Sequence, residues 1–367
     1  MRHTFLKCLF LLTILSSTSC KSGVETSNTV EGIGIRSAAV AGLSSLAAAI
    51  SSAGGVGGGG LFIPILTIVG GQDVKTASTY SAFMVTGGSV ANVASYTLWR
   101  SGGTARRLID YEMALLCQPW LLLGVSCGVV LNVVFPEWLI MLMFVVFVAG
   151  CTFKTCRSGA ACWRLESENG CEITKMPLLC ATADQAEAEA EVRTPWVPVG
   201  MLVLIWFSFF ALYLIRGNRY GQGIIEIEAC GIGYWIISSM QIPLAIFFTS
   251  WILFRRSSTT ASTQQVTAAT CSFMVLVSSS MSALQYLLLG MKQIYAALTY
   301  AAVCFVASLV GLTMIRKAIL RHGRPSIIIF SVATVMALSI VLMTSFGAID
   351  VWRSYTTGQN MGFKKPC

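Results

Sequence analysis

The amino-acid sequence predicts an all-α polytopic membrane protein with two related halves, arranged as an inverted repeat, and a glycine-broken, re-entrant helix pair in the first half. Three observations predict this fold class. Of the 367 residues, 55% are hydrophobic and only 11% are charged, whereas a soluble domain carries about 25% charged residues. The segment GGVGGGG fills positions 54–60 between two apolar runs. A stretch at 76–98 recurs without gaps at 266–288.

Uncharged apolar runs define the predicted membrane spans. Runs of roughly 18 residues or more indicate a helix that crosses the bilayer. The first candidate is a broken pair at 36–53 and 61–70, which enters the membrane and returns to the same side. The other candidates lie at 76–98, 113–135, 137–154, 195–215, 231–254, 267–289, 293–315 and 326–349.

The regions around these spans suggest how the chain is organised. Residues 1–20 have the features of a secretory signal peptide, because Arg2 and Lys7 precede an apolar run at 8–15 that is too short to span. The predicted organisation continues with a first transmembrane half (21–156), a cytosolic polar loop (157–194), a shortened second transmembrane half (195–349) and a C-terminal tail (350–367).

Basic residues predict the orientation. The loops around 99–111, 154–194, 255–265 and 316–325 together contain twice as many Lys and Arg residues as the opposite side. Because cytosolic loops carry an excess of Lys and Arg, we expect these four loops in the cytosol and both chain ends outside it. The net charge of +9 therefore reflects orientation in the bilayer, and we expect no nucleic-acid partner.

The glycine segment at 54–60 cannot form an ordinary helix, because glycine costs about 1 kcal/mol per helix position relative to alanine. Inside a membrane, non-helical backbone persists only where protein buries it or where it lines a watery cavity. Pro64 fits the first turn of a new helix over 61–70. That half-helix would direct its positive end at an anion near mid-membrane. Glycines also let helices pack closely without binding anything, and the segment alone leaves both interpretations open.

The recurring stretch indicates an inverted repeat. TASTYSAFMVTGGSVANVASYTL (76–98) aligns with VTAATCSFMVLVSSSMSALQYLL (266–288), with a Phe-Met-Val triplet and a tyrosine at matching positions. In the predicted topology the two copies cross the membrane in opposite directions, which is a common plan of secondary transporters with a site at the repeat interface. Small hydroxyl residues are also common in tight helix contacts, so each serine alone is better explained by packing than by ligand binding. The duplication beside a glycine break shifts the balance toward a transporter.

The composition argues against an enzyme. The chain has two histidines, His3 and His322, both outside the predicted spans, and its 13 cysteines form no CxxC pair and no ligand spacing with histidine. No Asp, Glu, Lys, Arg or His lies well inside a predicted span, so no embedded acid or base is present to activate a nucleophile. We therefore expect no catalytic residue, no bound metal and no cofactor.

Several segments together make the chain similar to a known family. The first half contains GGVGGGGLFIPIL (54–66) and STYSAFMVTGGSVAN (78–92), and the second contains GYWIISSMQIPLA (233–245) and RPSIIIFSVATVMALS (324–339). Over most of residues 35–363 the chain resembles the sulfite exporter TauE/SafE family, its plant branch in particular. The resemblance implies a multi-pass carrier of small sulfur-containing anions, such as sulfite or organosulfonates, with two related halves.

The second half departs from the family pattern. The family has a second glycine-rich hairpin before the second repeat helix, whereas here SSTTASTQQ (257–265) leads directly into that helix and no glycine occurs between Gly233 and Gly290. We therefore predict that about one helical hairpin is missing. Its loss leaves the predicted topology unchanged, because a hairpin crosses the membrane an even number of times, but it removes half of the expected anion site.

The predicted function is transport of a small anion by alternating access, with uncharged donors holding the solute at mid-membrane. The expected partners are this anionic solute and the lipid bilayer of the plasma membrane or an endomembrane. The alternative is a membrane scaffold or binding protein that keeps the fold without transport. The predicted substrate-binding groups are backbone N–H groups, hydroxyls and amides of Gly57, Gly58, Gly59, Gly60, Leu61, Thr79, Ser81, Ser89, Asn92, Gln118, Thr270, Ser272, Ser278 and Ser279.

Overall fold

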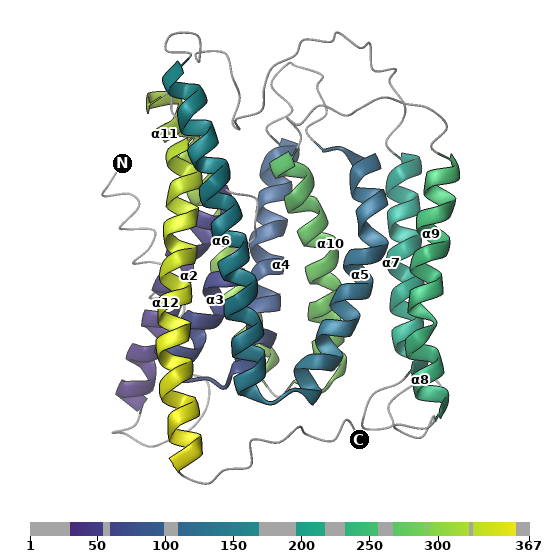
Figure 1. The fold of residues 1–367 in the computed structure, drawn as a ribbon, viewed down its shortest axis with the longest axis horizontal. Coiled ribbons are helices and arrows are strands. Elements are labelled where there is room, and N and C mark those ends of the chain that lie inside the picture. The colour runs from purple at the N-terminus through teal and green to yellow at the C-terminus, as the bar shows by residue number, and fades with distance from the viewer. Residues whose placement is uncertain are drawn as a thin grey trace. The chain divides into compact units, whose positions relative to one another are not determined.

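Long apolar helices make up nearly all of the described chain (Figure 1). A computed structural model describes residues 30–53, 59–98, 109–168, 196–216, 232–255, 267–291, 293–322 and 326–356. These residues contain no β-strand, and seven of their helices are long and apolar enough to cross a membrane. The chain is therefore an all-α polytopic membrane protein. The predicted signal peptide and the centre of the predicted polar loop lie outside the described residues.

The helix α4 (Val74–Leu98) is long enough to span but is more polar than the seven. Its 25 residues include many Ser and Thr side chains, and a helix of that length extends roughly 37 Å. Ser81, Ser89 and Asn92 are buried within the protein. Protein rather than lipid therefore covers the polar face of α4, which is how a membrane helix of this composition is accommodated.

Helix contacts divide the chain into two compact units that interleave along the sequence. The first unit comprises residues 1–95, 135–180 and 293–363, and the second comprises residues 96–134, 181–292 and 364–367. Each unit thus combines segments from both predicted halves. The predicted halves are defined by sequence similarity, which this grouping by contacts does not test, so the division at 21–156 and 195–349 stays a prediction.

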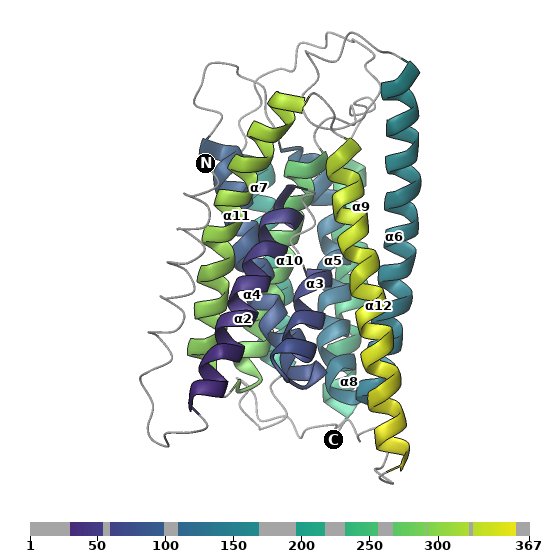
Figure 2. The ribbon, with the colours of Figure 1, turned by 90° about the vertical axis from the view of Figure 1, so that its left-hand side faces the viewer.

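The first unit surrounds a short broken helix. Figure 2 shows α3 between α2 and α12, and it contacts both of them. In the same unit, α11 packs against α2 and α6 packs against α12. Apart from the end of α4, the helices of this unit are α2 (Val30–Ala53), α3 (Gly59–Pro64), the π-helical turn η1 (Ile65–Val69), α4, α6 (Glu137–Glu168), α11 (Ile294–His322) and α12 (Ser326–Thr356).

Two glycines bring α11 into backbone contact with its neighbours. A Cβ on Gly311 of α11 would overlap the backbone of Ala49 in α2, and a Cβ on Gly87 of α4 would overlap the carbonyl oxygen of Ala301 in α11. Nearer the start of α2 and α11, the hydroxyls of Ser37 and Tyr300 lie 3.3 Å apart in a hydrogen bond. The Ser37–Tyr300 contact precedes the Ala49–Gly311 contact along both helices, so α2 and α11 run parallel. Such close approach allows van der Waals packing, which holds membrane helices together in the absence of a hydrophobic driving force.

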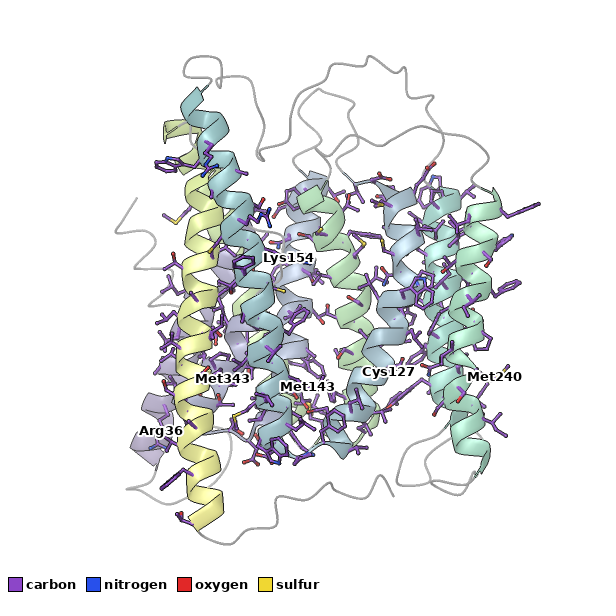
Figure 3. The ribbon with its side chains drawn as sticks, in the orientation of Figure 1. Arg36, Cys127, Met143, Lys154, Met240 and Met343 are labelled. Carbon is purple, nitrogen blue, oxygen red and sulfur yellow. The ribbon has the colours of Figure 1, made fainter. Side chains whose placement is uncertain are left out.

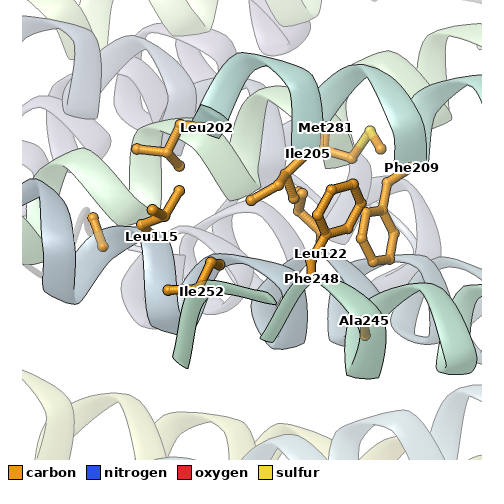
Figure 4. Packing of buried hydrophobic residues seen from close by; sticks show 10 residues of the cluster. Leu115, Leu122, Leu202, Ile205, Phe209, Ala245, Phe248, Ile252 and Met281 are labelled. Atoms are coloured by element: carbon orange, nitrogen blue, oxygen red, sulfur yellow. The ribbon is translucent and has the colours of Figure 1, made fainter. Parts of the chain in front are cut away.

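The second unit has an apolar core built from four helices (Figure 4). Leu122 of one helix, Phe209 of a second and Phe248 of a third meet in this core, and Met281 comes from a fourth. These large side chains are almost completely buried. The helices of this unit are α5 (Tyr111–Val134), α7 (Trp196–Arg216), α8 (Ile232–Ser239), α9 (Gln241–Arg255) and α10 (Thr267–Leu288).

Helix α6 corrects one predicted boundary. The predicted span ends at 154, where charged residues begin, but the helix continues to Glu168 and has 32 residues. At about 1.5 Å per residue it is near 48 Å long, which exceeds a hydrocarbon core of roughly 30 Å. Lys154, labelled in Figure 3, lies inside this continuous helix. A charged residue can end the membrane-embedded part of a helix without ending the helix itself. Residues 155–168 contain no proline that would stop the helix.

The predicted span at 231–254 contains an irregularity at Met240, between α8 and α9 (Figure 3). The N–H of Met240 still donates to Ile236 and that of Leu244 to Met240, so Ile236–Phe254 remains one candidate span. Pro243 explains the irregularity, because its ring clashes with the carbonyl four residues earlier, at Ser239, and it has no N–H to donate there. The remaining predicted spans agree with the observed helices to within several residues at their ends, apart from the extended α11 and α12.

Candidate functional site

The chain interrupts its helix at the glycine segment, as the sequence predicts. Helix α2 ends at Ala53 and α3 begins at Gly59, so the new helix begins two residues before the predicted start. Gly57 and Gly58 lie outside the described residues. A Cβ on Gly59 would lie 3.2 Å from Cγ2 of Val85 and 3.9 Å from Oγ of Ser81. The start of α3 therefore packs against the middle of α4.

Gly60 and Leu61 continue this start and are both half-buried. A Cβ on Gly60 would meet nothing within 4 Å, so open space lies beside this residue. Together with η1, α3 forms a continuous apolar helical segment over Gly59–Val69. The first N–H groups of a helix have no acceptor within it. The described part of this helical segment thus starts with Gly59, Gly60 and Leu61, within the first unit.

Pro64 creates a defect in this short helix that another helix repairs. The sequence predicts Pro64 in the first turn, but it is the last residue of α3, and η1 follows it. Because proline has no N–H, the carbonyl of Gly60 lacks its donor from four residues later. The buried hydroxyl of Ser339 in α12 donates to that carbonyl at 2.8 Å. Sequence reasoning missed Ser339, because it is 279 residues away from its acceptor.

The predicted hydroxyl ligands on α4 mostly bond within their own helix. Oγ1 of Thr79 donates to the carbonyl of Lys75 at 3.0 Å, and Oγ of Ser89 donates to that of Val85 at 2.7 Å. Oγ of Ser81 reaches the carbonyl of Gly59 only at 3.5 Å, which is a long contact. Backbone acceptors of this kind satisfy a buried hydroxyl locally. Of these three, only Ser81 connects α4 to the start of α3.

Asn92 differs from these hydroxyls. Its side chain is 1% exposed, and neither its Nδ2 nor its Oδ1 has a hydrogen-bond partner. A buried polar group without a partner costs about 1–3 kcal/mol, so such groups in proteins are satisfied by water or a ligand. Asn92 is therefore the predicted site residue in this unit with the clearest unfilled capacity to bind a polar group.

The structure adds Ser308 of α11, which sequence reasoning missed. Its side chain is 1% exposed and its Oγ has no hydrogen-bond partner. A Cβ on Gly88 of α4 would lie 3.1 Å from this oxygen, and Asn92 follows Gly88 by four residues, one helical turn along the same face. The sequence offers no signal for Ser308, because the same span also contains Thr299 and Thr313 and the contact with α4 is long-range.

The predicted residues of the second unit fall into two groups. Gln118 is fully buried with both amide atoms unpartnered, and Oγ of the buried Ser272 also has no partner. Oγ1 of Thr270 instead accepts the N–H of Asp110 at 2.9 Å. Ser278 and Ser279 donate to carbonyls of their own helix, at 2.9 Å and 3.3 Å. Gln118 and Ser272 are thus the open ligands here, whereas Thr270 connects α10 to the start of α5 and the two serines bond within α10.

A further amide in this unit was not predicted. Nε2 of the buried Gln285 donates to Oγ of Ser126 at 3.0 Å, and the hydroxyl of Tyr213 donates to the backbone carbonyl of Gln285 at 3.1 Å. These bonds connect α10 to α5 and α7, so they stabilise the helix contacts of this unit. The predicted site residues therefore divide between the units, and their grouping around one cavity stays a prediction.

Comparisons with known proteins identify the family. A family model described as "Sulfite exporter TauE/SafE" matches residues 4–155. "Sulfite exporter TauE/SafE family protein 2" of Arabidopsis thaliana is 48% identical over 404 residues, covering 89% of this chain and 86% of that protein. The chain belongs to the sulfite exporter TauE/SafE family. Family protein 1 of the same plant is 46% identical over 390 residues, covering 89% of this chain and 87% of that protein.

TauE/SafE proteins form a family of membrane transporters, not a family of enzymes, and this member is accordingly an integral, multi-pass membrane protein. No solved structure matches the chain. The alignment with TauE/SafE family protein 2 extends over 404 residues, which is more than the 367 residues of this chain. That relative therefore has residues at aligned positions where this TauE/SafE chain has none.

Proposed function

We propose that this chain carries a small sulfur-containing oxyanion, of the sulfite or organosulfonate class, across its membrane by alternating access. The observation that carries the proposal is the start of a helical segment at Gly59 against α4, the helix in which the Asn92 amide is buried without a partner. The name of its relatives, sulfite exporter family proteins, supports the choice of a sulfur oxyanion.

Uncharged donors suit this task. A helix N-terminus carries roughly half a positive charge in its unpaired N–H groups, and each amide or hydroxyl adds a donor. Together they stabilise an anion without a permanent counter-charge, so the anion is also released. We assign this role to the N–H groups of residues 57–61 and to Asn92 in the first unit, and to Gln118 and Ser272 in the second. By rotation of their hydroxyls, Thr79, Ser81 and Ser89 add donors in the first unit, and Thr270, Ser278 and Ser279 add donors in the second.

A matching contact in each unit supports the inverted repeat that alternating access requires. The Tyr80 hydroxyl donates to Oε1 of Gln293 at 2.8 Å, just before α11 begins. The repeat alignment places Thr270 at the position of Tyr80, and Thr270 accepts from Asp110, just before α5 begins. Each repeat helix thus contacts the start of a helix from the other half of the chain. An exchange of helices between two repeats of this kind is expected of an inverted-repeat carrier.

Replacing Gly59 by valine tests the transport proposal. The Cβ alone would lie 3.2 Å from Val85, and the added methyl groups will push α3 away from α4. We expect the initial rate of sulfite uptake into proteoliposomes to fall by about tenfold or more. Gly150→Val in α6 is the matched control, because a Cβ there meets nothing within 4 Å. Wild-type uptake by the Gly59 variant would refute this site.

One observation favours a second candidate function, a membrane scaffold or binding protein that has lost transport. The relatives have aligned residues that this chain lacks, and the family model matches only the first part of the chain. If the absent residues form the second glycine-rich hairpin, half of the proposed anion site is missing. The remaining helices would still form a membrane-embedded surface.

Restoring the hairpin separates the two candidates. The residues of TauE/SafE family protein 2 that have no counterpart in this chain are inserted at the predicted position, between residues 255 and 267, and sulfite flux is measured for both forms. Transport by the native chain supports the carrier. Flux that appears only after insertion supports the scaffold for the native chain, and a shuffled insertion of equal length controls for added mass.

A further inference from the structure

Two buried polar side chains without partners belong to α4 and α11 of the first unit. Asn92 has two unpartnered amide atoms, and Ser308 has an unpartnered hydroxyl oxygen. Both side chains are 1% exposed, so bulk water does not satisfy them. A Cβ on Gly88 would come within 3.1 Å of Oγ of Ser308, so this hydroxyl packs closely against the α4 backbone. Asn92 follows Gly88 by one helical turn on the same face of α4.

The hydrogen-bonding capacity of these groups limits what they bind. Nδ2 of Asn92 and the hydroxyl of Ser308 supply donors for the oxygens of an anion, whereas Oδ1 of Asn92 requires a donor from the ligand. Swapping the assigned positions of the Asn92 amide oxygen and nitrogen leaves this requirement the same, because both atoms are buried without a partner. The complementary ligand therefore offers acceptor oxygens together with one O–H group.

The charge of the surroundings limits the ligand further. No charged residue occurs in α4 from Thr76 to Leu98, in α11 from Ile294 to Ile315, or in α2 from Ser37 to Ala53, which packs on α11. Removing a charge from water without an opposite charge nearby is costly, and the cost rises steeply from one charge to two. The titratable groups on these three stretches are Tyr80, Tyr96, Tyr295, Tyr300 and Cys304.

We infer that Asn92 and Ser308 select the protonated, singly charged form of the oxyanion over the fully ionised dianion. This inference rests on the proposed function and narrows its substrate class to hydrogensulfite in its O–H form. The O–H of the ligand donates to Oδ1 of Asn92, and its other oxygens accept from Nδ2 and from Ser308. A dianion leaves Oδ1 facing negative charge, and a sulfonate, although singly charged, has no O–H to donate.

Equilibrium binding to the purified full-length protein tests this, by titration calorimetry from mildly acidic to mildly alkaline pH. The three probes are sulfite, which changes protonation over this range, sulfate, which stays a dianion, and methanesulfonate, a singly charged anion without an O–H. We expect sulfite to bind more tightly as the pH falls. At acidic pH, sulfate and methanesulfonate should bind at least about tenfold more weakly than sulfite. Sulfite affinity that rises with pH, or methanesulfonate binding equal to that of acidic sulfite, would overturn the inference.

Variants connect the pH profile to the named groups. Asn92→Leu should remove the pH dependence, and Ser308→Ala should weaken acidic binding by about threefold to tenfold. Thr313→Val on α11 is the control, because its hydroxyl is exposed and bonds to Val310. Tyr96→Phe and Cys304→Ala should keep the profile, and loss of it in either would overturn the assignment to Asn92.

The outcomes separate this inference from the proposed function. Binding of all three anions with no pH dependence contradicts the selection but leaves an anion carrier. No binding of any anion at any pH contradicts both. An Asn92→Leu variant that folds, as judged by size-exclusion chromatography, and binds like the wild type shows that the amide holds only water. Should that variant fail to fold, the smaller Ser308→Ala change decides by the same criterion.

Discussion

Ser339→Ala will destabilise the start of α3, and Pro64→Ala in the same chain will reverse that effect. The Ser339 hydroxyl donates to the Gly60 carbonyl at 2.8 Å, which Pro64 cannot reach with an N–H. Without it the half-buried carbonyl loses this donor, and a lost hydrogen bond of this kind costs about 1 kcal/mol in the free energy of unfolding. Alanine at position 64 restores an N–H in the correct helical position. Unfolding in mixed detergent micelles measures the change, and sulfite flux should fall and recover with it.

A double-mutant cycle makes the result specific. We expect the Ser339→Ala cost to shrink in the Pro64→Ala background by about 1 kcal/mol, because the two changes affect one carbonyl. Ser345→Ala provides the control on the same helix, since this exposed hydroxyl bonds only to the carbonyl of Val341 and its loss should change little. Strict additivity of the two substitutions would show that Ser339 does not compensate for Pro64.

Gly311→Ala will cause the largest loss of stability among the single-methyl changes in the first unit. The new Cβ would overlap backbone atoms of Ala49 in α2, and backbone cannot rotate away as a flexible side chain does. The helices must separate, and overpacking of this kind typically costs about 1–3 kcal/mol. Alanine gains only about 1 kcal/mol in helix propensity over glycine. Thermal unfolding and the yield of monodisperse protein measure the outcome.

The matched control for this change is Gly150→Ala, a helical glycine of the same unit with no atom within 4 Å of its Cβ position. It should be neutral or slightly stabilising, because propensity then acts alone. Ala49→Gly should rescue Gly311→Ala only in part, since the overlap includes the Cα and carbonyl oxygen of Ala49 as well as its Cβ. Equal stability of the two glycine variants would mean that α11 and α2 tolerate a wider separation.

The predictable part of this protein lies in local patterns. Length and apolar character predict helices such as α5 and α7, and the glycines at 54–60 predict the interruption between α2 and α3. The predicted helix boundaries are wrong where one residue type is compatible with two positions in a helix. Lys154 marks the end of an apolar span but not of a helix, and Pro64 fits a first turn but stands at the end of α3.

Long-range partners were outside the reach of sequence patterns. Ser308 is one hydroxyl residue among many, and only its position against Gly88 distinguishes it. The predicted hydroxyl ligands Thr79 and Ser89 have the right chemistry, yet their protons are directed to their own helix. Burial without a partner separates Asn92 and Gln118 from them, and burial depends on which helices pack together.

The sequence by itself determined that this chain is a multi-pass helical membrane protein, where its first broken helix lies, and to which family it is similar. These follow from composition and short-range order, because the bilayer requires each span to satisfy its own backbone. Only the tertiary structure decided that Ser339 donates a hydrogen bond to the Gly60 carbonyl and that Ser308 faces α4. Such pairs arise from contacts between helices, and nothing in the local pattern around either partner specifies the other.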